Sequence, residues 1–283
     1  MLLSLHWLKE FIPNLKINEE IAESLTSLGL EVSSVTKKQK DLIIDIDLTP
    51  NRGDCLSVYG IARDLNSLFN KKVKYPKVKK LSKINKKKYI QSLDIRICPS
   101  YSCLSISGLN NRIKTPALIK SRLRSSGIKN INFLVDIINY VMLEIGQPMH
   151  VFDLDKLKLP LSVKYANKTE LFEGLDNNKY KLTKKIPVIS DQSGPIALAG
   201  VLGGQETSTS QKTRNVLIES AFFEPDQIRQ SSKSFRLQTD SSYRYERGVD
   251  PKLPMTALSR VLELLNEYSA YDSVFIDSKI SRK

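Results

Sequence analysis

Two stretches near the C-terminal end hold side chains whose types and spacing suit a binding site. The apolar run Val216–Ile218 indicates a buried strand that ends at Glu219. A carboxylate is costly inside a core unless it is paired, so Glu219 needs a partner or a ligand. The hydroxyl-rich stretch TDSSYRYERG, residues 239–248, adds small side chains that let a ligand come close to the backbone. A pocket wall that binds a small polar substrate is one interpretation, and a capped helix with a solvated charged face is the other, which composition alone favours.

Hydrophobic periodicity predicts the elements of the N-terminal part. Amphipathic helices are expected over residues 4–12 and 58–69, with a half-exposed strand over 41–48. A further helix is expected to start at a cap on Asn18 and to stop at Gly29.

Residues 71–88, KKVKYPKVKKLSKINKKK, interrupt this pattern with closely spaced lysines. Like charges so close together repel, which predicts an extended linker, with contact to RNA phosphates as the alternative. The expected division is therefore an N-terminal structural domain over 1–70, a lysine-rich linker over 71–90 and a larger domain over 91–283.

The larger domain is expected to mix strands and helices without a regular rhythm. Strands are predicted near 93–97, 103–107, 163, 186–189 and 196–201, and helices after a cap on Thr115, over 133–145 and over 252–268. The helix that ends before Gly146 would deliver His150 into a loop, and the last dozen residues resemble a strand whose partners are missing. The absence of a repeat or of a strict βαβ alternation predicts an α+β fold, with a small α+β domain followed by a larger mixed one.

Composition narrows the function classes. The 283 residues carry 44 Lys and Arg against 30 Asp and Glu, a formal charge of +14 that favours a polyanionic partner such as RNA. The spacing of Cys55, Cys98 and Cys103 fits neither a disulfide framework nor a metal site, so buried thiols are expected. No stretch has the apolar length of a membrane span and no secretory signal is evident, which predicts a cytoplasmic protein with no membrane partner.

Four segments, in order along the chain, resemble the β chain of bacterial phenylalanyl-tRNA synthetase. They are TPNRGDCLS, NYVMLEIGQPMHVFD, NVLIESAFF and TDSSYRYERGVDP. The resemblance implies an N-terminal domain followed by an editing domain, which hydrolyses tyrosine wrongly esterified to the phenylalanine tRNA. In that family an oligonucleotide-binding barrel interrupts the N-terminal domain, whereas here only Thr36–Lys40 joins the two halves.

The resemblance also implies roles for individual residues. Glu219 would accept a hydrogen bond from the tyrosine hydroxyl, and Gly203 would leave room for its ring. His150 would orient the ester or the attacking water, acting by position rather than as a strong base, and Asn139 would assist by hydrogen bonding.

Three further residues complete the implied site. Thr239 and Ser241 would shape the amino-acid end of the pocket, although many relatives have alanine where this chain has Ser241. Lys129 stands where many bacterial relatives have arginine, and lysine lacks the planar two-point contact that arginine makes with phosphate.

The implied partners are the 3′ end of tRNA(Phe) and the synthetase α chain, with no DNA. ATP and Mg²⁺ are expected only in the complex with the α chain, and this chain is expected to hold no cofactor and no metal. The leading hypothesis is a truncated β chain that hydrolyses mischarged Tyr-tRNA(Phe), which leaves open whether the natural chain ends at Lys283. The alternatives are a non-catalytic RNA-binding or scaffold remnant and, third, an editing hydrolase for another aminoacyl-tRNA.

Overall fold

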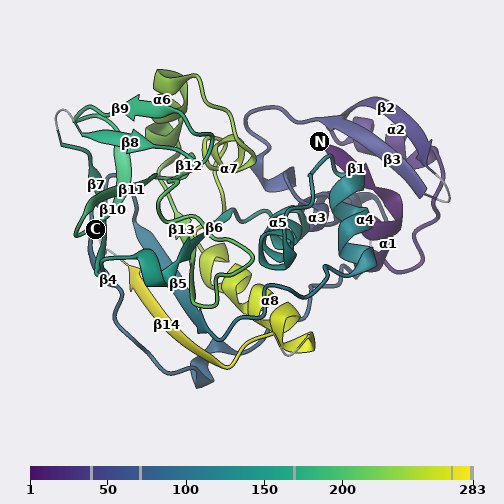
Figure 1. The fold of residues 1–283 in the computed structure, drawn as a ribbon. Coiled ribbons are helices and arrows are strands. Elements are labelled where there is room, and N and C mark those ends of the chain that lie inside the picture. Colours follow the sequence, from purple (N-terminus) through teal and green to yellow (C-terminus); the bar gives the residue numbers. More distant parts are fainter. Residues whose placement is uncertain (39–40, 70–71, 168–169, 269, 281–283) are drawn as a thin grey trace. The chain divides into compact units, whose positions relative to one another are not determined.

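The computed structural model describes residues 1–38, 41–69, 72–167, 170–268 and 270–280 (Figure 1). Contacts divide the chain into two compact units. Unit 1 comprises Met1–Lys77 and Lys114–Gly146, and unit 2 comprises Val78–Ile113 and Gln147–Lys283. Unit 1 therefore includes residues that the sequence division had placed in the domain over 91–283, and that division stays a prediction.

Some predicted boundaries fall outside the described residues. These are Gln39 and Lys40 in the short connection, Asn70 and Lys71 at the start of the linker, and Lys283 at the end of the sequence. Within the described residues, no helix combines the length and the apolar composition that a bilayer crossing needs.

Unit 1 packs helices on a three-stranded antiparallel sheet with the order β1-β3-β2. The strands are β1 (Leu2–Ser4), β2 (Glu31–Lys38) and β3 (Asp41–Asp47). The helices are α1 (Leu5–Phe11), α2 (Glu20–Ser27), α3 (Val58–Phe69), α4 (Ala117–Ser125) and α5 (Phe133–Ile145), with a 3₁₀ turn, η1, at Gly53–Cys55. The helices predicted over 58–69 and 133–145 are confirmed, because each carries an apolar stripe that the unit buries.

Two predicted helix caps are wrong, since a carboxylate engages each side chain instead. Asn18 donates its amide to the Glu20 carboxylate at 2.8 Å, and α2 begins without a side-chain cap. The Thr115 hydroxyl donates to the buried Asp136 carboxylate at 2.6 Å. A charged acceptor makes the stronger hydrogen bond. Each side chain therefore donates to the carboxylate and does not accept from the backbone N–H groups that a cap would satisfy.

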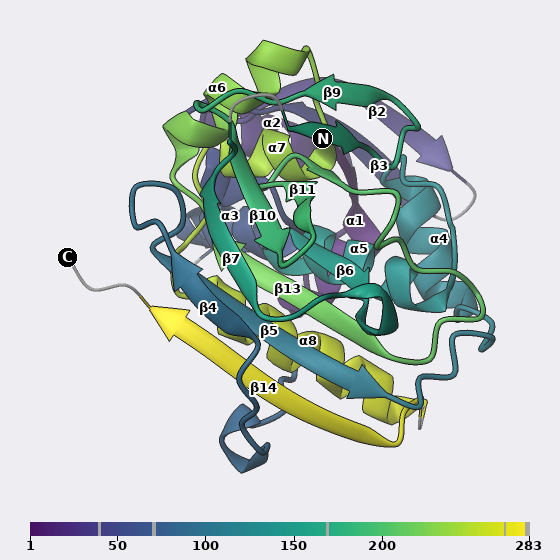
Figure 2. The same ribbon diagram turned by 60° about the vertical axis from the view of Figure 1, so that its left-hand side comes forward.

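Unit 2 contains two sheets with a shared core. One sheet has the antiparallel order β14-β5-β13-β6, and helix α8 (Leu253–Glu267) lies along one of its faces (Figure 2). Its strands are β5 (Ser100–Ser107), β6 (Met149–Asp153), β13 (Val216–Phe222) and β14 (Ser273–Ile280). The other face contributes Tyr101, Phe152 and Leu217 to the shared core.

The second sheet of unit 2 has the order β12-β11-β10-β7-β4. Its strands are β4 (Ile90–Leu93), β7 (Leu161–Tyr165), β10 (Pro187–Asp191), β11 (Gly194–Leu198) and β12 (Leu202–Gly203). The unit also contains the pair β8 (Leu171–Glu173) and β9 (Lys179–Lys181), helices α6 (Pro225–Phe235) and α7 (Asp240–Tyr245), and 3₁₀ turns η2 (Leu81–Lys83) and η3 (Leu154–Lys156). Among the strand pairs of the described residues, only β4 and β7 run parallel, which confirms the α+β class.

Two strand predictions need correction. The C-terminal strand has a partner, because β14 pairs with β5 from Ser273 opposite Ser107 to Ile280 opposite Ser100. The strand expected over 93–97 ends at Leu93, where Asp94 starts a turn and its carboxylate accepts hydrogen bonds from Arg96.

Candidate functional site

Glu219 and His150 lie side by side on neighbouring strands of unit 2. Glu219 occupies the middle of β13 and is directly opposite His150 of β6 in the antiparallel register. Side chains at directly opposed positions point to the same face of a sheet, here the face that carries Leu217 into the core. The sequence had placed Glu219 at a strand end and His150 in a loop. Both placements are wrong, because β13 continues through Phe222 and its pairing with β6 draws His150 into a strand.

Both side chains have a polar atom that nothing in the described structure satisfies. His150 Nε2 and Glu219 Oε2 are buried and have no hydrogen-bond partner among the described residues. Most buried polar groups in proteins are hydrogen-bonded, and each exception requires an explanation. Two such atoms at adjacent register positions indicate a site whose partner is a ligand or water.

A small cavity lies against both residues. Its volume is about 50 Å³, which holds a few water molecules. An engineered apolar cavity of about 150 Å³ binds benzene, so entry of a phenol ring requires this cavity to widen. The lining comes from β6, β10, β11, β12, β13, α7 and the turn before β12, and consists of Pro148, Met149, His150, Ile189, Ala197, Leu198, Gly200, Val201, Leu202, Gly203, Glu219, Ser241 and Tyr245.

Gly203 lies directly against the imidazole of His150. A Cβ atom added at Gly203 would lie 2.2 Å from Cε1 and 2.6 Å from Nε2 of that ring. Real Cβ atoms do not approach other heavy atoms so closely, so the missing side chain gives His150 the space it occupies. The role expected for Gly203, leaving room for a substrate ring, stays a prediction.

Burial keeps both ionisable groups uncharged at neutral pH. It raises the pKa of Glu219 to about 8, while the Tyr101 hydroxyl acts in the opposite sense. Burial also lowers the pKa of His150 to about 4. A protonated carboxyl group and a neutral imidazole can each donate and accept a hydrogen bond, so each suits a ligand group or a water that does both.

The other predicted site residues are distributed over both units. Ser241 lines the cavity. Thr239 caps α7 and donates its hydroxyl to the carbonyl oxygen of Val201 at 2.9 Å, so it fixes the turn beside the cavity without lining it. Asn139, in α5, and Lys129, in the connection before α5, belong to unit 1 and do not line the cavity. The roles of these residues stay predictions.

Two residues that the sequence interpretation missed hold the cavity walls. The Tyr245 hydroxyl lies 3.0 Å from the carbonyl oxygen of Pro148 and 3.2 Å from that of Ala221. The Gln147 amide donates to the same two carbonyl groups, at 2.9 Å each. These contacts fasten the start of β6 to the end of β13. Tyr245 lies within the segment 239–248 that the sequence had singled out, but its hydrogen-bond partners are about a hundred and about twenty residues away.

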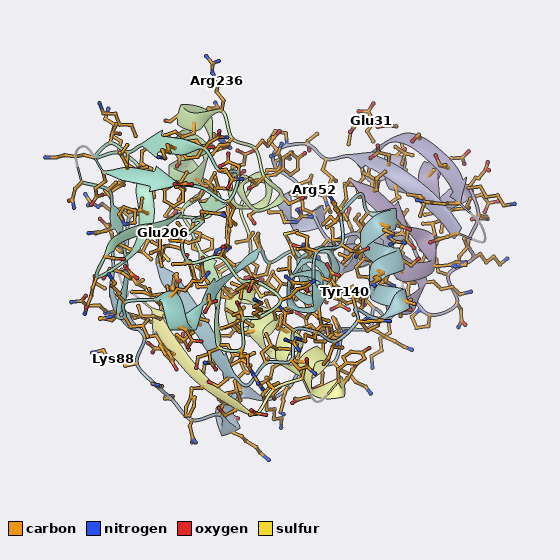
Figure 3. All side chains as sticks on the ribbon, viewed as in Figure 1. Glu31, Arg52, Lys88, Tyr140, Glu206 and Arg236 are labelled. Carbon is orange, nitrogen blue, oxygen red and sulfur yellow. The ribbon has the colours of Figure 1, made fainter. Side chains whose placement is uncertain are left out.

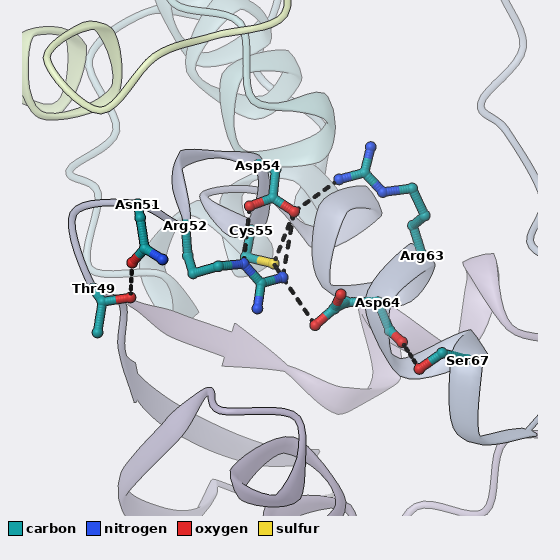
Figure 4. Close-up of polar contacts among 8 residues, drawn as sticks. All are labelled: Thr49, Asn51, Arg52, Asp54, Cys55, Arg63, Asp64 and Ser67. Atoms are coloured by element: carbon teal, nitrogen blue, oxygen red, sulfur yellow. Dashed lines mark hydrogen bonds and ion pairs between the residues drawn. The ribbon is translucent and has the colours of Figure 1, made fainter.

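A second polar cluster, the arginine turn, lies in unit 1 and comprises Arg52, Asp54, Cys55, Arg63 and Asp64 (Figure 4). Arg52 pairs with Asp54 at 3.1 Å and with Asp64 at 2.9 Å, and its Nη2 lies 2.8 Å from the sulfur of Cys55. Asp54, Cys55 and Asp64 are residue types that hold metal ions, and their ligand atoms lie within 4.8 Å of one another. The guanidinium already supplies the positive charge there, so we assign no metal to this turn.

Residues 97–270, more than half of the chain, match the B3/4 domain family. The chain belongs to the B3/4 domain family. All residues that line the cavity lie within this B3/4 region.

Curated relatives confirm the resemblance drawn from the sequence. The phenylalanine–tRNA ligase β subunit of Francisella tularensis is 42% identical over 256 residues, which cover 88% of this chain and 32% of that protein. The corresponding subunit of Coxiella burnetii is 43% identical over 226 residues, or 80% of this chain and 28% of that one. The chain thus spans about a third of the length of these relatives. A crystal structure of an N-terminal fragment of the phenylalanyl-tRNA synthetase β-subunit from Pyrococcus horikoshii has a TM-score of 0.44 and 19% identity, and covers 98% of this chain and 74% of that one.

Proposed function

We propose that the B3/4 region hydrolyses the ester that joins tyrosine to tRNA(Phe). In this way the chain would contribute to phenylalanyl-tRNA synthesis together with an α chain. The observation that carries the proposal is the pair formed by His150 Nε2 and Glu219 Oε2, two buried polar atoms without partners beside one cavity. The names of the curated relatives supply phenylalanine and tRNA, and tyrosine enters the proposal through its hydroxyl, which Glu219 would bind.

Glu219 matches the chemical difference between tyrosine and phenylalanine. An apolar pocket rejects an added hydroxyl by only about 100-fold, so a synthesis site for phenylalanine leaves some tyrosine to be removed. A second site that hydrogen-bonds the hydroxyl rejects the analogue that lacks it by about 10⁴-fold or more, because its own polar atoms would stay unpaired. Glu219 Oε2 is such an atom beside the cavity.

Glu219 is proposed to bind the phenol. Because its pKa is raised to about 8, its carboxyl group keeps its proton at pH 7 and can both accept from and donate to the phenol oxygen. Leu202 lines the cavity and is partly exposed, so its displacement is a direct way for the cavity to widen around the ring.

His150 is proposed to position the attacking water. A pKa of about 4 makes the imidazole a weak base, so it acts as a hydrogen-bond acceptor that orders the water rather than as a strong proton acceptor. The water oxygen attacks the ester carbonyl carbon, and the ribose oxygen of the tRNA leaves with a proton. An aminoacyl ester is already labile, so positioning supplies much of the required acceleration.

Deacylation of tyrosyl-tRNA(Phe) tests the proposal. Glu219→Ala is expected to slow release of tyrosine about 10- to 100-fold, the effect of losing one or two hydrogen bonds in a buried site. His150→Ala is expected to lower the maximal rate more than the affinity. Phenylalanyl-tRNA(Phe) serves as the control substrate and should stay intact with the parent protein. Release of tyrosine by Glu219→Ala at the parental rate would contradict the recognition role.

A non-catalytic RNA-binding or scaffold role is the second candidate. The small volume of the cavity and the hydroxyl that Ser241 adds to its lining favour this candidate, because both limit space for a tyrosine ring. Binding of tRNA without turnover, in a protein whose cavity residues are unaltered, would support the scaffold role over hydrolysis.

A further inference from the structure

A lysine-rich segment of unit 2, residues 78–90, contains basic side chains and no acidic one. We call it the lysine strap. It carries Lys79, Lys80, Lys83, Lys86, Lys87 and Lys88, and the sequence contains no acidic residue between Asp64 and Asp94. Only Lys79 among these lysines is partly buried, and the others are exposed. Figure 3 shows Lys88 directed away from the ribbon.

Backbone contacts hold the lysine strap against unit 2. The Lys79 carbonyl oxygen accepts a hydrogen bond from the Ser259 hydroxyl of α8 at 2.5 Å. The Lys87 N–H donates to the carbonyl oxygen of Ile276 in β14 at 3.0 Å. The carboxylate of Asp277 accepts from the N–H groups of Tyr89 at 2.7 Å and Ile90 at 2.9 Å. The strap is therefore a fastened segment, where the sequence had predicted an extended linker.

Buried anchors leave the lysine side chains facing solvent. Leu81 is 9% exposed, Tyr89 is 1% exposed and Ile90 is 2% exposed. Lys87 lies over the rings of Tyr89 and Phe275, with its nitrogen 5.6 and 5.8 Å from their centroids. The remaining exposed lysines, Lys80, Lys83, Lys86 and Lys88, take part in none of the ion pairs found among the described residues.

We propose that the lysine strap is a docking surface for the phosphate backbone of RNA. Lysine ammonium groups on flexible stems neutralise phosphates without a fixed geometry, and release of the bound counterions supplies the affinity. Such binding does not read sequence. It would add to the ester-hydrolysing site a separate contact that raises the local concentration of tRNA.

The same features disfavour a membrane as the partner. Binding in a bilayer interface requires an exposed apolar face beside the basic one. Leu81, Tyr89 and Ile90 are instead buried in the unit, and Val78, 41% exposed, is a single apolar side chain rather than a face. An RNA backbone requires only the exposed charges that the strap provides.

Charge reversal within the strap tests the proposal. The variant with Lys83, Lys86 and Lys88 changed to Glu is compared with a matched variant in which Lys181, Lys184 and Lys185, exposed in the same unit, are changed to Glu. Binding of a tRNA(Phe) transcript that carries no amino acid is measured by fluorescence anisotropy between 50 and 300 mM KCl. In the strap variant, the slope of log affinity against log salt should become shallower by about two to three. Its affinity at 100 mM KCl should fall by at least about tenfold. The matched variant should lose much less, and Lys→Arg at the same three strap positions should keep the parental slope.

Three results would overturn the proposal. One is an equal loss in both triple-Glu variants, which would show that only net charge matters. Another is parental RNA binding by the strap variant. The third is that this variant loses binding to vesicles containing anionic lipid while its RNA binding is unchanged. Glu219→Gln separates this proposal from ester hydrolysis, because it should slow deacylation and leave the salt slope unchanged.

Discussion

The arginine turn of unit 1 and the cavity of unit 2 treat carboxyl groups in opposite ways: Asp54 and Asp64 of the turn are exposed or half-buried, whereas Glu219 is buried. In the turn, Asp54 and Asp64 each pair with Arg52. In the cavity, Glu219 leaves Oε2 without a partner, and the neighbouring His150 is also incompletely hydrogen-bonded. The turn therefore gives each carboxylate a cation of the protein itself, although Asp64 Oδ2 meets Arg52 as an ion pair without hydrogen-bond geometry, whereas no ion pair of the described residues includes Glu219.

The two sites also move carboxyl pKa values in opposite directions. Burial by itself would raise the pKa of Asp54, but hydrogen bonds and charge from Arg52 hold it below its ordinary value. Glu219 has no such cation, so burial raises its pKa to about 8. A carboxyl group paired with a cation is typical of a structural contact, and a buried neutral acid without a cation is a candidate for a binding site.

The largest expected effect comes from filling the space beside His150. Gly203→Ala places a methyl group within 2.2 Å of Cε1 of that ring. The imidazole has to move, so deacylation of tyrosyl-tRNA(Phe) should fall by more than about 100-fold, as expected when a positioning group is displaced by about 1 Å. Overpacking should also lower the free energy of unfolding by about 1–3 kcal/mol, measured by urea denaturation.

The double variant Gly203→Ala with His150→Ala separates the clash from other causes. Removing the ring should restore most of the stability lost in Gly203→Ala without restoring hydrolysis. If the double variant is as unstable as the two single changes added together, the proposed clash does not exist.

An intermediate effect on stability alone is expected in the arginine turn. Arg52→Met leaves Asp54 and Asp64 without their shared cation and should lower the free energy of unfolding by about 1–3 kcal/mol, a range reduced for partial exposure. Arg63→Met is the matched control, because Arg63 contacts only Asp54 in the turn and its side chain is 54% exposed; about 0.5 kcal/mol or less is expected. Both variants should deacylate at the parental rate, and a slow Arg52→Met enzyme would place the turn in the reaction.

The smallest effect is a pH dependence of stability that Glu219→Gln removes. Between pH 6.5 and 8 the folded protein retains the Glu219 proton, while the unfolded chain, with a carboxyl pKa near 4.5, has lost it. Parental stability should therefore fall by about 2 kcal/mol as pH rises through this window. His150 does not interfere with this measurement. Its stabilising contribution is complete above pH 6.5 and is lost only as the pH falls from 6.5 towards 4.

Thermal or urea unfolding at several pH values within the window measures this difference. Glu206→Gln, a change at an exposed acid of unit 2 (Figure 3), should retain the parental slope. A Glu219→Gln protein with the same slope as the parent would show that the carboxyl group is ionised in the folded state.

Much of the local structure followed from the sequence because the signals were local. The helices over 58–69 and 133–145 carry periodic apolar stripes, and Gly146 ends the second in the left-handed conformation that glycine favours, with φ of 92°. Glu219 was singled out for a reason that the structure supports, since an acid within an apolar run is buried there without a full set of partners.

The remaining errors concern contacts between distant segments. His150 was assigned to a loop because nothing near it in the sequence reveals its pairing with Glu219, 69 residues away along the chain. The C-terminal strand looked unpaired because its partner, β5, lies far upstream. Thr115 fits the local pattern of a helix cap, yet a distant carboxylate binds its hydroxyl. Tertiary contacts override local preference at such positions.

The hydrogen bonds from Tyr89 and Ile90 to Asp277 span 188 and 187 residues. A nascent polypeptide leaving the ribosome cannot form them until residue 277 has been translated, and the edge of β5 that pairs with β14 stays unpaired until the same stage. Contacts of such long range form slowly, and an open edge recruits other strands meanwhile. This chain should therefore depend on chaperones until residues 273–280 have been translated.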